Sequence, residues 1–253
     1  AAVTVRFGGS SKDPLFLRMQ EEVFDMQGID WSVIIEYRES FIRGFITTIE
    51  LTVVGILFGT LIGLILGLMS ISRIKVLTIP AKAYVDLFRG TPLMLQILAI
   101  HFGVIPTICE MLAVDTPSAL ISGFIALSLN AGAYIAEIFR GGILSIHKGQ
   151  MEAARSLGMT YGQAMRLVIL PQAFKRMLPP LGNEFIALMK DSSLVMVIAV
   201  NDITYAAMTT AKSTWERLAP YATAALMYLV LTYLLSRLVF YLERRFDTGR
   251  KEG

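Results

Sequence analysis

The sequence has 253 residues, of which 55% are hydrophobic and only 17% are charged. A mean hydropathy of +0.60 argues against an ordinary water-soluble domain and indicates a chain that lies mostly within a membrane. The formal net charge is +3, but the lysines and arginines lie in short clusters between apolar runs, so membrane topology explains them better than a nucleic-acid partner does.

The chain begins with a segment of mixed charge, residues 1–43, in which no basic stretch is followed by an apolar one. We therefore expect no cleavable signal peptide in this segment. Phe16, Met19, Val23 and Met26 recur at helical spacing, which predicts an amphipathic helix that lies on the membrane surface.

Five later segments are apolar enough to cross a bilayer as helices, which takes about 20 residues. They cover residues 45–71, 93–114, 119–138, 181–200 and 218–242. The fourth is the weakest because Lys190 and Asp191 interrupt it. The expected fold is therefore all-α and integral to the membrane, with five transmembrane helices.

Positive charge in the connecting loops predicts the direction of these spans. The loops after the first, third and fifth spans are rich in lysine and arginine, whereas the loop after the second has none. We therefore expect an external N-terminus and a cytoplasmic tail at residues 243–253. The five basic residues within residues 1–43 disagree with this orientation.

The first span contains Gly55, Gly59, Gly63 and Gly67, each four residues from the next. These glycines form a ridge without side chains along one face of the helix. The spacing predicts that another helix packs closely against that ridge. In the second span, Pro106 is expected to kink the helix.

The loop between the third and fourth spans, residues 140–180, is neither fully apolar nor rich in turn residues. It holds a spaced pattern of Glu-Ala-Ala, three residues, Gly, nine residues and an apolar-x-Leu-Pro ending. The residues of this pattern considered for contact with a partner are Glu152, Ala153, Ala154, Gly158, Leu170 and Pro171. We expect a short helix that turns at Gly158 and a second, amphipathic helix that ends near Pro171.

This pattern resembles the EAA loop of ABC importer permeases, with Val168 in the place of the usual isoleucine. Further motifs at residues 88–92, 133–142 and 181–192 resemble the histidine/glutamine branch of that family. The resemblance covers residues 44–242. It implies a type I ABC importer permease of the bacterial plasma membrane, which moves a polar amino acid by alternating access.

The resemblance also implies partners. In this family the loop forms a coupling helix that docks on an ATPase. The implied assembly has two ATP-binding cassette ATPase subunits, a second permease copy or a close relative, and an external solute-binding protein or fused binding domain. The sequence has no Gly-x4-Gly-Lys-Ser/Thr loop, so we expect the partner subunits to bind ATP and magnesium and this chain to be no enzyme.

No cofactor or metal site is expected, because His101 and His147 are far apart in the expected topology. Ionisable groups within the membrane cost about 2.5 to 3.5 kcal/mol each on insertion scales, so they need an explanation. One hypothesis is that Lys190, Asp191, Ser192 and Ser193 bind the carboxylate and ammonium groups of the substrate. They can share one cavity only if the helix unwinds there.

An equally open alternative is that Lys190 and Asp191 pair with charges on neighbouring helices. Asn130, at mid-depth in the third span, either contacts the substrate or makes an interhelical hydrogen bond. Glu50 lies closer to the outer surface and is a candidate only if the substrate is cationic. Glu137 has the i, i+3 spacing of an ion pair with Arg140 at the cytoplasmic end of the same span.

Three other functions are alternatives. An ion-coupled secondary carrier would need no ATPase, but many such carriers show internal repeats and this sequence shows none that is convincing. A membrane-embedded enzyme would need a catalytic motif that the sequence lacks. An ABC permease for a solute other than an amino acid remains open at this level.

Overall fold

A computed structural model describes residues 29–246 and has no strand within that range. The expected surface helix around residues 16–26 lies outside the described residues. In chain order the helices are α2 Ser32–Glu36, α3 Arg38–Ser70, α4 Lys75–Gly90, α5 Leu93–Ala99, η2 Ile100–Val104, α6 Ile105–Leu112, α7 Ala119–Leu144, α8 Lys148–Ser156, α9 Tyr161–Ala164, η3 Met165–Ile169, α10 Leu170–Asp191, η4 Ser192–Ile198, α11 Ile203–Thr214 and α12 Leu218–Phe246. Of the three η segments, η2 and η3 are π-helical and η4 is a 3-10 helix.

The number of candidate spans agrees with the expectation. Within the described residues, α3, the run from α5 through η2 to α6, α7 and α12 are each long and apolar enough to cross a membrane. A fifth span is obtained if residues 161–198 and α11, which meet at a 45° bend, count as one broken unit. The predicted all-α membrane fold is therefore confirmed.

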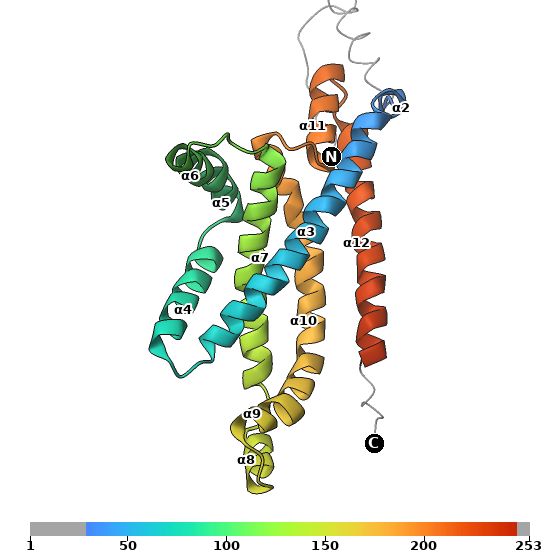
Figure 1. The fold of residues 1–253 in the computed structure, drawn as a ribbon. Coiled ribbons are helices and arrows are strands. Elements are labelled where there is room, and N and C mark those ends of the chain that lie inside the picture. The colour runs from blue at the N-terminus through green and yellow to red at the C-terminus, as the bar shows by residue number, and fades with distance from the viewer. Residues whose placement is uncertain (1–28, 247–253) are drawn as a thin grey trace, which may run out of the picture.

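Figure 1 shows how these helices are arranged. α7 packs against α3 and α10, and α12 packs against α10 and α11. The two short helices α8 and α9 project beyond one end of the bundle, whereas α2 and α11 lie at the opposite end (Figure 1). α4, α5 and α6 lean out on one side of α7 (Figure 1).

The glycine ridge of α3 is buried against α7, as its spacing predicts. A Cβ atom added at Gly59 would lie 2.8 Å from the Cβ of Ala131, and one at Gly63 would lie 2.6 Å from Ile135 Cγ2. A Cβ at Gly67 would lie 2.8 Å from Phe139 Cβ. The absence of side chains therefore sets the distance between the two helix backbones.

The core of the bundle lies along α7. Leu127 and Ile135 of α7 are fully buried, together with Leu51 of α3, and Leu188 of α10 is 2% exposed. Much of the remaining apolar surface of the spans is exposed, for example Leu57 of α3 at 63%. This distribution suits a helix bundle whose outer face meets lipid rather than water.

The expected start of the fourth span at residue 181 is wrong, since α10 begins at Leu170 and continues through Pro179 and Pro180. Pro171 likewise begins this helix instead of ending one. A proline lacks the N–H that would bond to the residue four positions earlier, and its ring crowds that carbonyl. The π-helical segment η3 lies directly before Pro171 and widens the turn where that bond is lost.

The second span shows the same arrangement, because η2 lies directly before Pro106 of α6. Two further segments were expected to be loops but are helical. Residues 75–90 form α4, whose buried residues Ala81 and Val85 face the bundle. Residues 203–214 form α11, which packs between α3 and α12. The backbone of a polar segment next to the membrane is thereby hydrogen-bonded within the chain.

Replacing Gly63 by alanine should destabilise the fold, because the new methyl group would overlap Ile135 and approach the backbone of α7. Overpacking of this kind typically costs about 1 to 3 kcal/mol. Thermal unfolding of the purified chain in detergent would measure the change. The matched control is Gly141→Ala in α7, since no atom lies within 4 Å of its added Cβ. Equal melting temperatures for the two variants would contradict the close-packing account.

Candidate functional site

The two helices that project from the bundle, α8 and α9, together with their turn form what we call the knob, residues 148–164 (Figure 1). α8 ends at Ser156, and Gly158 has a φ of +86°, a conformation that glycine adopts without strain. The Gly158 N–H donates to the carbonyl of Arg155 at 3.1 Å. A capping box of Thr160 and Gln163 then begins α9. The expected turn at Gly158 is confirmed.

Two hydrogen bonds from α10 reach the knob and the residues just before it. Arg176 of α10 donates through Nη1 to the carbonyl oxygen of Ser145, and Gln172 donates through Nε2 to Gln150 Oε1 at 3.3 Å. The pattern residues exposed at the surface are Glu152, Ala153, Gly158, Leu170 and Pro171. Ala154 is only 4% exposed and packs within the chain. Within residues 148–164 the exposed charged side chains are those of Lys148, Glu152 and Arg155, and Glu152 is the one acidic side chain among them.

At the other end of α10 the helix changes its geometry within the predicted substrate segment. α10 ends at Asp191, and the tighter 3-10 helix η4 begins at Ser192. Lys190 is exposed, while Asp191 and Ser193 are partly buried. Ser192 is fully buried and donates to the carbonyl of Met189 at 2.7 Å. A 3-10 helix has about 3.0 residues per turn and is wound more tightly than an α-helix, so this change of helix type is not the unwinding that a shared cavity for the four side chains requires.

Lys190 and Asp191 form no ion pair with the described residues of the chain. Within residues 29–245, no carboxylate lies within 4.0 Å of the Lys190 ammonium, and no cationic side chain lies that close to the Asp191 carboxylate. The alternative hypothesis, in which both residues pair with charges on neighbouring helices of the same chain, has no such contact in its favour. Contact with substrate remains a prediction.

Asp202 marks the break that follows η4, and the sequence analysis did not single it out. It is fully buried and caps α11, because its carboxylate accepts hydrogen bonds from the backbone N–H groups of Thr204 at 3.0 Å and Tyr205 at 2.9 Å. The Tyr228 hydroxyl of α12 also donates to it at 2.9 Å. The backbone N–H of Ile203, the residue after Asp202, donates to Thr48 Oγ1 of α3 at 3.3 Å. Asp202 therefore joins α11 to α12, and the adjacent Ile203 N–H joins it to α3.

Asn130 makes an interhelical hydrogen bond. Its Nδ2 donates to Gln96 Oε1 of α5 at 2.9 Å, and it is only 6% exposed. Gln96 in turn donates through Nε2 to the carbonyl of Phe88 at 2.7 Å and to Thr91 at 2.9 Å. These bonds satisfy the backbone where α4 gives way to α5. Glu50 is exposed on α3, and no hydrogen bond or ion pair joins Asn130 or Glu50 to the Lys190–Ser193 segment among the described residues.

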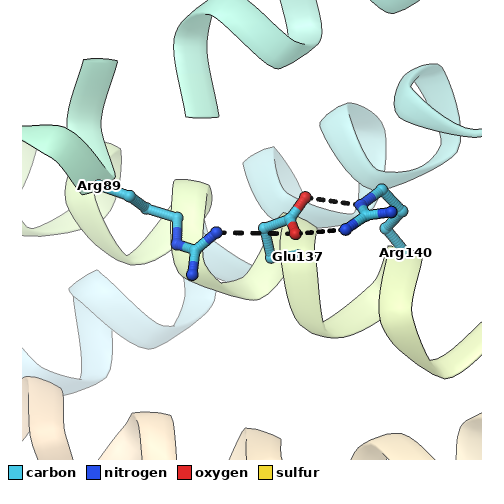
Figure 2. Close-up of polar contacts among 3 residues, drawn as sticks. All are labelled: Arg89, Glu137 and Arg140. Atoms are coloured by element: carbon cyan, nitrogen blue, oxygen red, sulfur yellow. Dashed lines mark hydrogen bonds and ion pairs between the residues drawn. The ribbon is translucent and has the colours of Figure 1, made fainter. Parts of the chain in front are cut away.

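Glu137 pairs with two arginines from two helices, as Figure 2 shows. Arg140 of α7 donates to both carboxylate oxygens of Glu137 at 2.7 Å, in the arrangement that its i, i+3 spacing predicts. Arg89 at the end of α4 approaches the same carboxylate at 3.6 Å and lies 5.4 Å from the centre of the Tyr134 ring. Arg89 was treated as a loop charge in the sequence analysis, so this bridge between α4 and α7 was missed.

Comparison with known proteins gives one matching family and many relatives. The family described as "Binding-protein-dependent transport system inner membrane component" matches residues 45–248. The arginine transport system permease protein ArtQ of Bacillus subtilis is 37% identical over 87% of this chain and 99% of its own length. The glutamine transport system permease protein GlnP of Escherichia coli is 37% identical over 85% of this chain and 97% of its length.

Solved structures agree with these sequences. The crystal structure of an amino acid ABC transporter with histidines matches with a TM-score of 0.78 and 42% identity, over 87% of this chain and 100% of that chain. An inward-facing structure of the MetNI methionine ABC transporter matches with a TM-score of 0.69 over 82% of this chain and 96% of that chain. Its identity of 22% supports the fold alone.

Replacing Glu137 by glutamine should lower the melting temperature of the purified chain, because Arg89 and Arg140 lose their shared anion. The three side chains are 25% to 43% exposed, so solvent screening limits the expected loss to about 1 kcal/mol. The control is Glu39→Gln, whose pair with Arg43 is 3.9 Å apart and about three-quarters exposed. That variant should unfold like the parent. A larger loss for Glu39→Gln than for Glu137→Gln would refute the assignment.

Proposed function

The chain belongs to the family of binding-protein-dependent transport system inner membrane components, and from this membership we propose how its parts carry a polar amino acid inward. It is a multi-pass inner-membrane permease subunit of an amino-acid ABC importer. ATP hydrolysis belongs to a separate subunit in such systems. The knob, the helix break and the partner subunits each have a separate role in such an importer.

The observation that carries the proposal is the knob itself. It extends beyond the end of the bundle (Figure 1), exposes Glu152, and turns at a glycine whose φ of +86° side chains rarely adopt. A short rigid helix of this kind suits insertion into a groove of another protein, where Ala153 permits close approach and Glu152 meets a basic rim. We assign the knob as the docking element for an ATP-binding cassette ATPase on the cytoplasmic side.

The complete importer would contain two ATPase subunits and two permease chains, either identical or closely related. An external solute-binding protein or fused domain would deliver the substrate. ATP binding would bring the ATPases together and move the two knobs with them. The spans of the two permeases would then pass from an inward-facing to an outward-facing arrangement. ATP and magnesium would be held by the ATPase subunits and not by this chain.

The substrate is proposed to be a polar amino acid bound at the break between α10 and η4. Lys190 would donate to the substrate carboxylate, and Asp191 with Ser193 would accept from its ammonium group. Relatives are named for arginine, glutamine, and glutamate with aspartate, so the side chain of the substrate is left open. Asn130 and Ser192 donate hydrogen bonds to groups within the protein. They would therefore position the neighbouring helices and not contact the substrate. Glu50 would contribute only if the substrate is cationic.

Family membership favours this assignment over an ion-coupled carrier, which would need no ATPase. The deciding experiment is reconstitution of the chain in proteoliposomes with its ATPase and binding protein. Uptake of radiolabelled arginine, glutamine, glutamate and histidine would be measured with and without internal ATP. We expect ATP-dependent uptake of at least one of them. Uptake that follows an ion gradient and ignores ATP would overturn the proposal.

Gly158→Val should uncouple transport from ATP hydrolysis in this assay. A β-branched residue at a left-handed φ costs about 1 to 2 kcal/mol. This corresponds to a roughly tenfold lower ratio of knobs with the native turn to knobs without it. Uptake should fall by a similar factor while membrane insertion stays normal. The control is Gly162→Ala in α9, where no atom lies within 4 Å of the added Cβ. Full coupling in Gly158→Val would count against the knob as docking element. Glu152→Lys, a reversal of charge, should also reduce coupling.

Lys190→Gln should raise the apparent KM for uptake, since the substrate carboxylate would lose a charged donor. Hydrogen bonds to charged groups contribute about 1.5 to 3 kcal/mol, which predicts a rise of roughly 10- to 100-fold. Lys175→Gln is the matched control, because Lys175 is exposed on the same helix near the knob. Equal changes in the two variants would mean that Lys190 does not contact the substrate.

A further inference from the structure

A cavity of about 640 Å³ lies between the end of α3 and the knob. Residues from three parts of the chain line it: the last turn of α3, the turn that leads to α4, and the segment from α8 to η3. It is separate from the break at Ser192, which lies at the far end of α10. Two of its lining residues, Arg155 and Tyr161, belong to the knob, but neither takes part in the docking or substrate contacts proposed above.

Two arginines face the cavity without a neutralising partner. Arg73 comes from the turn after α3, and Arg155 comes from the last turn of α8. Within residues 29–245, neither guanidinium lies within 4.0 Å of a carboxylate. The three ion pairs found in that range involve other arginines. Two cations that share a cavity repel each other, and the arrangement is favourable when an anion lies between them.

Local hydrogen bonds fix the turn that carries Arg73 and the side chain of Arg155. The turn that carries Arg73 is fixed by Thr78, whose hydroxyl donates to the carbonyl of Ser72 at 2.9 Å. Arg155 donates from one guanidinium nitrogen to the carbonyl of Met159 at 2.8 Å. A guanidinium has five N–H donors in a planar fork that matches phosphate oxygens. Donors of both side chains therefore remain for a ligand.

The rest of the lining is apolar and belongs to a membrane span. Leu68 and Ile71 come from the end of α3, and Met165 comes from η3. Leu68 is 46% exposed, on a helix long and apolar enough to cross the bilayer. Inorganic phosphate would fill only a small part of a cavity of this size. A phosphate group with an attached glycerol and the first carbons of an acyl chain fits both the volume and the lining.

We propose that this cavity binds the headgroup of an anionic membrane lipid, with Arg73 and Arg155 as its cationic ligands and Leu68 and Ile71 against its acyl chain. Basic pockets between membrane helices and the adjoining cytoplasmic segments suit such headgroups. The bound lipid would join the end of α3 to the knob. This inference concerns lipid binding to the chain alone and does not depend on the transported amino acid or on an ATPase.

Native mass spectrometry of the purified full-length chain, titrated with phosphatidylglycerol, tests the inference. We expect one tightly retained phosphatidylglycerol and weak retention of zwitterionic phosphatidylcholine. Arg73→Gln should weaken the tight site about fivefold, and Arg73→Gln combined with Arg155→Gln about 25-fold, if each arginine contributes as basic residues near anionic membranes do. Arg73→Lys should bind between the parent and Arg73→Gln because it keeps the charge but loses the planar fork.

Lys75→Gln is the matched control, since Lys75 is exposed and close in sequence to Arg73 but does not line the cavity. It should bind phosphatidylglycerol like the parent. An equal loss of lipid binding in Lys75→Gln would mean a diffuse surface effect and would overturn the proposal.

Displacement of the lipid by millimolar inorganic phosphate would indicate a soluble-anion site and would also overturn it. So would unchanged lipid binding in Arg73→Gln together with weaker ATPase binding in lipid-free detergent, because the arginines would then serve the ATPase. Arg155→Gln alone gives the same readout if Arg73→Gln fails to fold.

Discussion

Inside a bilayer the solvent around a helix is as apolar as its side chains, so helices associate through close packing and not through the exclusion of water. The contact between α3 and α7 meets this constraint with four glycines on one face of α3. Because their backbones approach so closely, α7 becomes the central helix of the bundle. α10 packs on α7 beside α3, and α12 and α11 pack on those helices in turn.

α7 also makes a series of polar contacts with the segment from α4 to α5. Tyr84 donates to the carbonyl of Leu129 at 2.8 Å, Asn130 bonds to Gln96, and Glu137 meets Arg89. These bonds lie at successive depths along α7. They hold α4 and α5 at the side of the bundle, where the packing is looser than that of α3. The chain thus combines the closely packed pair of α3 and α7 with a segment, α4 and α5, that polar bonds also attach to α7.

The sequence was informative where one physical cause dominates. The glycine spacing predicted the buried face of α3, and the i, i+3 spacing predicted the bond between Glu137 and Arg140. The prolines were misread, because Pro171 was treated as a helix end although a π-helical segment can absorb its missing hydrogen bond. α4 and α11 were missed because their polar residues resemble loops when only hydropathy is considered. Asp202 could have been found from its place before Ile203 and Thr204, which is typical of a helix N-cap.

The continuity of the chain from α9 through η3 and α10 to η4 has a structural consequence. Residues 161–198 form one continuous helical segment, and its stretch from Tyr161 to Asp191 measures roughly 45 Å along the helix path at 1.5 Å per residue. One end of this segment belongs to the knob, and the other is the point where the helix tightens beside Lys190. The two places are therefore joined by helical backbone without an intervening loop.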